Sequence, residues 1–162
     1  MIKKVSIYDL DGTVICSMHR YRTNKHGKID LEYWRQNDTP EKIAKDSLLP
    51  LAERYKADLR NPEVFVIIAT ARACIENDAN YKYIRDNLGM PNKFIHRKGN
   101  SDSRKGAELK YKGIRPILNL KNFSDVVIHV YEDNIDYLKE LCDAFAKTHK
   151  TVGHYNPSKQ GY

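Results

Sequence analysis

The sequence predicts an α/β fold in which a parallel sheet is covered by helices on both faces. The run at residues 64–69 is continuously apolar, and the run at 126–131 is apolar except for His129, as parallel strands buried on both faces are. Segments in which apolar residues recur at helical spacing alternate with these runs along the chain. Strands separated by helices favour a parallel sheet. We therefore expect a Rossmann-like, three-layer α/β/α sheet in a single domain over residues 1–162.

Short sequence signals give the approximate limits of the elements. Asp38, Thr39 and Pro40 are a capping sequence that opens a helix. Gly89 and Pro91 end another helix, because neither residue continues a helix well. The predicted elements, in chain order, are a strand over 3–8, a helix over 40–59, a strand over 64–69, a helix over 76–88, a strand over 93–96, a helix over 107–120 interrupted at Pro116, a strand over 126–131, a helix over 134–149 and an edge strand over 151–155.

The composition bounds the class of protein. No apolar run approaches the roughly 20 residues that a membrane-spanning helix needs, and the amino terminus passes into a strand without a signal-peptide pattern. The three cysteines, Cys16, Cys74 and Cys142, form no C-x-x-C pair, which argues against a disulfide framework and against a zinc site. We expect a cytoplasmic protein with reduced, packed cysteines and no obligate protein partner.

The positive charge is concentrated in one part of the chain. Residues 81–125 contain eleven basic and four acidic residues, so this segment accounts for the whole net charge of +7. A concentrated positive field attracts polyanions and speeds their encounter, so a nucleic acid or a nucleotide phosphate is the expected partner. The alternative is a solvated basic surface that serves solubility.

Two carboxylates follow the first predicted strand. Asp9 and Asp11 are two residues apart, so they project to the same side, and Gly12 marks the turn that follows them. Two like charges this close repel unless a cation offsets them, and Mg²⁺ prefers such oxygen ligands. A strand end at which aspartates only cap a turn is the alternative.

Polar residues also follow the other strands. Thr70 and Arg72 end the second strand, and Glu132 and Asp133 end the fourth. Lys110 falls near the start of a helix that can face the same edge. The carboxyl ends of parallel strands meet at one edge of a sheet, where ligands bind. We therefore expect these groups to converge, although each has a structural explanation as a helix cap, a surface lysine or an acid favoured at a helix start.

The order of these motifs resembles the haloacid dehalogenase superfamily of phosphotransferases, and the resemblance spans nearly the whole chain. The opening Asp-Leu-Asp-Gly-Thr at residues 9–13 is its most specific part. Residues 69–72, residues 131–134 and the run Asp102-x-Arg104-Lys105 before Lys110 look like motifs of the 3′-phosphatase half of phage polynucleotide kinase/phosphatases. Glu132 stands where an aspartate is commoner, so which acid of the 132–133 pair contacts the metal stays open.

The resemblance implies a mechanism for hydrolysis of phosphomonoesters. Asp9 would attack phosphorus and form an aspartyl-phosphate, and Asp11 would act as general acid and base. The acid role needs a raised pKa, for which Asp9 is the expected cause. Thr70 would bind a phosphate oxygen and Lys110 would supply fixed positive charge. The expected Mg²⁺ site comprises the Asp9 carboxylate, the backbone carbonyl of Asp11, and Asp133, with Glu132 as the other candidate acid.

Substrate choice is expected to lie in residues 14–39, which we interpret as a small β-hairpin flap with its turn at residues 24–27. Cations and aromatics alternate there, as in surfaces that bind phosphates and bases. The expected substrate-binding residues are Arg20, Arg22, Trp34, Arg72, Arg104 and Lys105. The favoured function is a polynucleotide 3′-phosphatase with an open site. The alternatives are a small-molecule phosphatase such as a 5′-nucleotidase, and a non-catalytic nucleic-acid-binding module.

Overall fold

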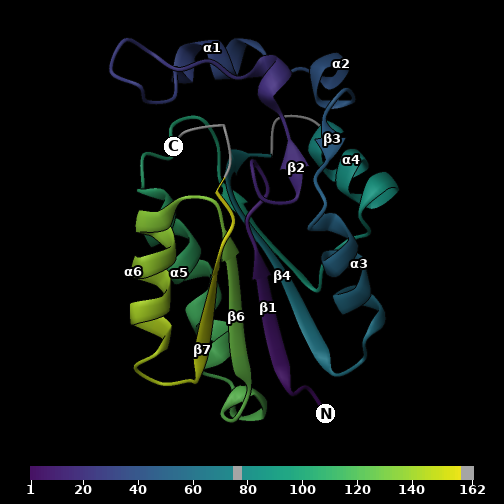
Figure 1. Cartoon of the computed structure of the whole chain (residues 1–162), viewed down its shortest axis with the longest axis vertical. Helices are drawn as coiled ribbons and strands as arrows, with labels where there is room; N and C mark the ends of the chain where they lie inside the picture. The colour runs from purple at the N-terminus through teal and green to yellow at the C-terminus, as the bar shows by residue number, and fades with distance from the viewer. Residues whose placement is uncertain (75–77, 158–162) are drawn as a thin grey trace.

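The computed structural model describes residues 1–74 and 78–157, and its centre is a five-stranded, fully parallel sheet in the order β5-β4-β1-β6-β7 (Figure 1). The predicted Rossmann-like fold is confirmed. The strands are β1 (Lys4–Tyr8), β4 (Val64–Ala73), β5 (Lys93–Arg97), β6 (Val127–Glu132) and β7 (Thr151–Tyr155).

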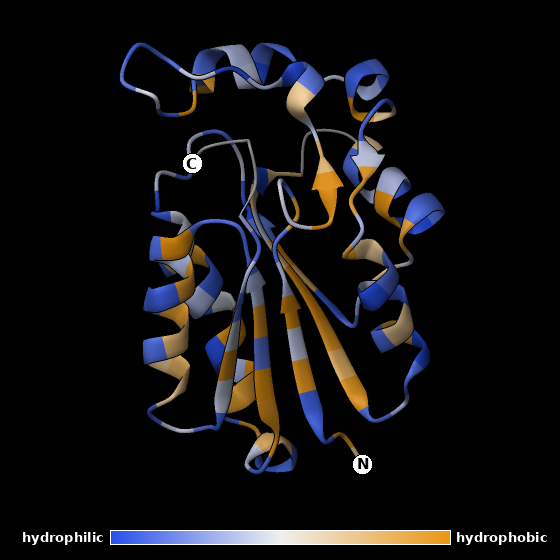
Figure 2. Ribbon diagram, viewed as in Figure 1, coloured by the Kyte–Doolittle hydropathy of each residue, from blue (hydrophilic) through white to orange (hydrophobic). Residues whose placement is uncertain are grey.

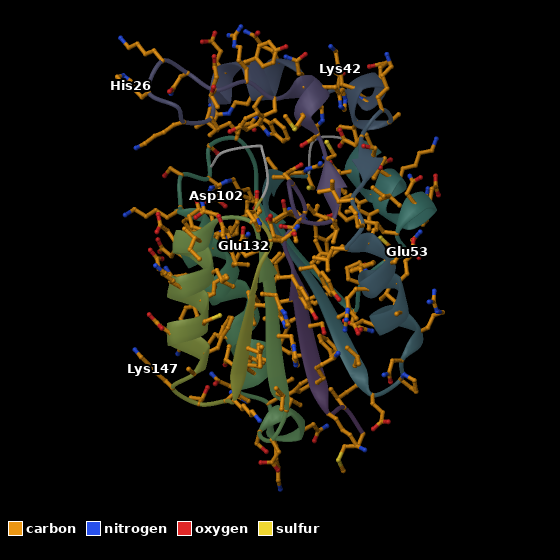
Figure 3. The ribbon with its side chains drawn as sticks, in the orientation of Figure 1. His26, Lys42, Glu53, Asp102, Glu132 and Lys147 are labelled. Carbon is orange, nitrogen blue, oxygen red and sulfur yellow. The ribbon has the colours of Figure 1, made fainter. Side chains whose placement is uncertain are left out.

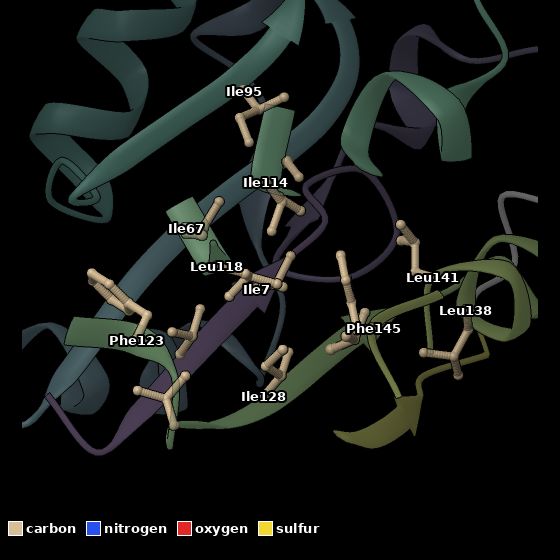
Figure 4. Close-up of a cluster of buried hydrophobic side chains, with 14 residues drawn as sticks. Ile7, Ile67, Ile95, Ile114, Leu118, Phe123, Ile128, Leu138, Leu141 and Phe145 are labelled. Carbon is tan, nitrogen blue, oxygen red and sulfur yellow. The ribbon is translucent and has the colours of Figure 1, made fainter. Parts of the chain in front are cut away.

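Helices cover both faces of the sheet. One face packs against α3 (Ala52–Arg60) and α4 (Ala79–Asn87), and the other packs against α5 (Gly106–Leu118) and α6 (Ile135–Phe145). Figure 4 shows the second of these cores, in which isoleucines of the strands meet leucines and a phenylalanine of the helices. The sheet is therefore the middle of three layers.

Side chains that alternate along each strand point to opposite faces of the sheet and contribute to the two hydrophobic cores. In β1, Val5 and Ile7 belong to the core beneath α5 and α6, whereas Tyr8 belongs to the core on the opposite face. In β6, Val130 belongs to the core beneath α5 and α6, and Tyr131 belongs to the core on the opposite face. Such strands are buried on both sides, so their sequences are almost continuously apolar. In the ribbon of Figure 2, orange predominates along β4, and orange bands recur along β1 and β6.

Residues 15–48 form a small cap over the carboxyl ends of the strands (Figure 1). The predicted turn is present, closed by a bridge between Thr23 and Ile29, but two extended hairpin strands are not. Short helices take their place because Asp30 and Thr39 cap them by accepting backbone N–H groups. The cap contains, in order, β2 (Ile15–Cys16), a 3₁₀ helix (Met18–Arg20), α1 (Leu31–Gln36), α2 (Pro40–Ile43) and β3 (Ser47–Leu48).

The predicted helix over 40–59 is wrong in its middle. The chain leaves the helical conformation after Ile43, and β3 pairs antiparallel with β2 before α3 begins at Ala52. Pro50 disfavours helical backbone at the residue before it. Asp46 is buried and ion-paired there, an interaction that the periodicity of apolar residues does not reveal.

Other limits differ by a few residues. The second strand, β4, continues beyond the predicted residue 69 to Ala73, α5 runs through Pro116 without interruption, and the predicted helix over 134–149 ends at Phe145. The predicted start of the helix over 76–88 lies outside the described residues. None of the helices within residues 1–74 and 78–157 combines the length and apolar character needed to cross a membrane.

Gly106, the first residue of α5, allows that helix to approach α6 closely. A Cβ atom at Gly106 would lie 2.6 Å from Cε2 of Tyr137. We expect Gly106→Ala to lower the free energy of unfolding by about 1–3 kcal/mol, because overpacking forces the two helices apart. Urea denaturation measures the loss. Gly99→Ala is the control, because nothing lies within 4 Å of its Cβ position; equal effects of the two substitutions would contradict the packing argument.

Candidate active site

The polar residues that follow the strands meet in one cavity beneath the cap. Asp9 and Asp11 come from the turn after β1, Thr70 from β4, and Glu132 and Asp133 from the end of β6. All five side chains are buried and line the cavity. Figure 3 shows Glu132 where the strands end, below the cap residues His26 and Lys42. The structure thus brings together groups that the sequence separates by more than 120 residues.

Lys110 lies at the centre of this site. From the second turn of α5 its Nζ donates to Asp9 Oδ1 at 2.9 Å and to Glu132 Oε2 at 2.7 Å. Burial opposes the charge of Lys110, but the two carboxylates hold its pKa above the ordinary value. Thr13 donates to the other oxygen of Asp9 at 3.0 Å. The Asp9 carboxylate is therefore held in place from two sides.

Asp9, Glu132 and Asp133 form a candidate metal site. One carboxylate oxygen from each lies within 4.8 Å of the others. Burial, and then the nearby charge of Asp9, raise the pKa of Glu132 to about 7. A buried group of three carboxylates with one lysine retains excess negative charge, which a hard divalent cation such as Mg²⁺ would offset. The residues fit the predicted cofactor.

Asp11 has a different partner. Arg72 donates to its two carboxylate oxygens at 2.9 and 2.6 Å, and Ser17 donates at 2.7 Å. Burial alone would raise the pKa of Asp11, but the Arg72 guanidinium holds that pKa below its ordinary value. The expected upward shift caused by Asp9 is therefore wrong for the free protein. The Asp11 carboxylate also lies outside the group of three acids.

Buried ion pairs connect Asp11 to the cap. The Arg72 guanidinium also donates to Asp46 at 3.0 Å, and Asp46 in turn accepts two hydrogen bonds from Arg20 at 2.9 and 3.0 Å. Asn80 accepts the remaining arm of Arg72 at 2.7 Å. Arg20 is fully buried. Arg20 and Arg72, both predicted to bind substrate, are thus engaged with carboxylates of the protein itself.

The other predicted substrate-binding residues divide into two groups. Trp34 lines the cavity, with the Arg20 guanidinium carbon 4.3 Å from its ring centroid. Arg22 instead pairs with Asp30, and Arg104 pairs with Asp102. Arg22, Arg104 and Lys105 do not line the cavity.

Sequence reasoning missed several cavity residues. Arg97 ends β5, so the rule that ligands gather at strand ends would have found it had that strand not been predicted to stop at residue 96. Asn134 and Tyr137 follow the acidic pair at the start of α6. Arg35 and Asn100 reach the cavity from the cap and from the loop after β5, and no local signal marks them.

The fold is that of solved haloacid dehalogenase (HAD) domains, as the resemblance in the sequence predicted. The HAD domain of the Legionella pneumophila effector Lem4, solved as an inactive mutant, matches 99% of this chain and 90% of its own, with a TM-score of 0.57 and 16% identity. A chain of the Pnkp1/Rnl/Hen1 RNA repair complex matches 96% of this chain and 44% of its own, with a TM-score of 0.57 and 16% identity. At these identities the likeness shows the fold alone.

The chain belongs to the family described as bacteriophage T5 5′-deoxynucleotidase, whose model matches residues 1–96. The 5′-deoxynucleotidase of Escherichia phage T5 is 36% identical over 87 residues. This match covers 52% of the chain and 35% of the phage enzyme, so the chain spans about a third of that relative's length.

Proposed function

We propose that this protein is a Mg²⁺-dependent phosphatase that hydrolyses nucleotide phosphomonoesters through an aspartyl-phosphate on Asp9. The observation that carries the proposal is the setting of Asp9. Its carboxylate is fixed by Lys110 and Thr13 inside a cavity, beside two further buried acids, Glu132 and Asp133. A carboxylate fixed in this way can attack phosphorus and divide ester hydrolysis into two easier steps. The family name supports a nucleotide as substrate.

The chain's own residues supply positioning and charge. Lys110 restrains Asp9 and places a positive charge beside the phosphate, and Thr70 can donate its hydroxyl hydrogen to a phosphate oxygen while it accepts from the backbone of Arg72. Mg²⁺ held by Asp9, Glu132 and Asp133 would neutralise charge between nucleophile and phosphate. These contributions are largely electrostatic preorganisation of the site.

Asp11 is the general acid and base in this proposal. Because Arg72 keeps Asp11 ionised in the free protein, the proton must come with the substrate or from a rise in the pKa of Asp11. An arriving phosphomonoester can supply either. Its negative charge raises the pKa of Asp11, and the fraction that is still a monoanion near neutral pH carries a proton, since its second pKa is about 6. After transfer to the leaving oxygen, Asp11 is again a base for the attacking water.

The cap favours a mononucleotide over the end of a polymer. The cavity has a volume of about 240 Å³ and is roofed by residues of α1 and of the segment before it. A 3′-phosphorylated polynucleotide end is the second candidate. It is favoured by the excess positive charge of residues 81–125, which includes Arg104 and Lys105 outside the cavity.

Phosphate release from four substrate classes tests the proposal: deoxynucleoside 5′-monophosphates, 3′-monophosphates, and oligonucleotides phosphorylated at either end. We expect Mg²⁺-dependent release that is fastest from mononucleotides and is stopped by a chelator. Release confined to 3′-phosphorylated oligonucleotides would establish the second candidate. No release from any substrate, with nucleic acid still bound, would make the protein a binding module and refute the proposal.

Metal binding has a readout that does not depend on activity. A ligand that binds only the folded state stabilises it by RT ln(1 + [L]/Kd), so Mg²⁺ should raise the melting temperature. We expect Asp133→Asn to remove most of this increase. Asp125→Asn is the matched control, because Asp125 is exposed and precedes β6 at the opposite end of the strand. An undiminished increase in Asp133→Asn would exclude Asp133 as a ligand.

A further inference from the structure

We infer that the underside of the cap, formed by Ile29, Leu31 and Trp34, is a nucleobase-binding surface that selects single nucleotides. This inference rests on the proposed function and identifies the subsite for the part of the substrate that does not react. The three residues line the same cavity as Asp9, but they belong to the cap and not to the sheet. The cavity thus has a charged floor and an apolar roof, which suits a ligand with a phosphate at one end and an aromatic base at the other.

The apolar character of the roof is costly without a ligand. Leu31 is 51% exposed although it lines a cavity, and Ile29 and Trp34 are only half-buried. Apolar surface exposed to water is unfavourable relative to the same surface buried. The flat face of a base removes such surface from water and stacks on indole, and stacking of this kind tolerates any base.

Trp34 is held in a fixed position relative to the reacting groups. The Arg20 guanidinium lies against its ring, and the same guanidinium is held by Asp46. Asp46 shares Arg72 with Asp11, so a continuous chain of buried ion pairs joins the roof to the floor of the cavity. A surface that is ordered before the ligand arrives loses less entropy on binding.

Polar groups lie where the edge of a base or its sugar can reach them. Arg35 and Asn100 line the cavity together, and Arg35 Nη2 donates to the carbonyl oxygen of Asn100 at 3.3 Å. This contact joins α1 to the loop after β5 at the lining of the cavity. The cavity, about 240 Å³, is smaller than the roughly 300–1,000 Å³ that is usual for ligand sites, which favours one nucleotide over a strand.

The fluorescence of Trp34 gives a direct test, because it is the only tryptophan in the chain. The Asp9→Asn variant with Mg²⁺, in which turnover is expected to be very slow, is titrated with a deoxynucleoside 5′-monophosphate, with 2-deoxyribose 5-phosphate and with inorganic phosphate. We expect the nucleotide to change the emission saturably and the two base-free phosphates to leave it nearly constant. An equal response to all three, or a nucleotide that competes with phosphate without changing the emission, would overturn the inference.

Kinetics of the wild-type enzyme and a surface variant separate this inference from the proposed function. Leu31→Asn should raise the KM for the nucleotide by roughly tenfold, the scale of one lost apolar contact, and leave kcat and the KM for 2-deoxyribose 5-phosphate nearly unchanged. Leu120→Asn is the matched control, because Leu120 is 54% exposed and does not line the cavity. Nucleotide turnover that is indifferent to Leu31→Asn would refute the base surface and keep the phosphatase. A saturable, nucleotide-specific change in fluorescence without turnover would refute the phosphatase and keep the base surface.

Discussion

Asp9→Asn is expected to lower the rate of phosphate release by at least about 10³-fold while the protein remains folded. The amide cannot act as the nucleophile, and it also removes one of the three acids that would hold the metal. Folding should survive, because Lys110 retains its ion pair with Glu132 and can donate to the amide oxygen. Steady-state release and thermal unfolding, measured on the same preparation, separate the two effects.

Asp125→Asn serves again as the control, because it makes the same chemical change at an exposed position away from the cavity. It should leave both rate and melting temperature nearly unchanged. If Asp9→Asn retained a rate within tenfold of the wild type, the nucleophile would be another group and the proposed mechanism would be wrong.

The second large effect is expected at Lys110. Lys110→Met keeps the length of the side chain but leaves Asp9 and Glu132 without their shared cation. Removing one partner of a buried ion pair typically costs about 3–5 kcal/mol. We expect a loss of this size in the free energy of unfolding in the presence of a chelator, measured by urea denaturation, together with a large loss of activity. Lys112→Met on the same helix replaces an exposed lysine and should cost less than about 1 kcal/mol.

The loss in Lys110→Met should depend on pH. The pKa of Glu132 is already raised in the folded protein, and the absence of Lys110 raises it further, so the folded state binds a proton that the unfolded state has released. Stability therefore falls as pH rises from the unfolded pKa of Glu132, about 4.3, through the folded one. The metal-free variant should be more stable at pH 6 than at pH 8. A loss that is independent of pH would show that Lys110 contributes packing and not charge.

The edge of the sheet that carries the site was predictable from the sequence. Apolar runs identify the strands, and the polar residues that follow each run must meet because parallel strands end at the same edge. Asp9, Thr70 and Glu132 therefore came together as expected, and Lys110 joined them from a helix. Local sequence was sufficient for the residues that follow the strands, because parallel strands place those residues at the same edge of the sheet.

The roles of the arginines were not predictable in the same way. A sequence shows that Arg20 and Arg72 are cations near a phosphate site, but it does not show that Asp46 will be buried between them. The burial of Asp46 depends on the break in the predicted helix over residues 40–59. Because the chain leaves the helix after Ile43, the residues that follow pack into the cap. Whether an arginine binds substrate or a carboxylate of its own chain is decided by such long-range packing.

The most direct test of the account is to stop the reaction with acid and look for phosphate bound to the protein. Protein, Mg²⁺ and a deoxynucleoside 5′-monophosphate are mixed, quenched within a turnover and digested for mass spectrometry. The account predicts a phosphoryl group on the peptide that contains Asp9, absent when a chelator is included. Rapid hydrolysis with no phosphoryl group on that peptide, or with one on another residue, would contradict it.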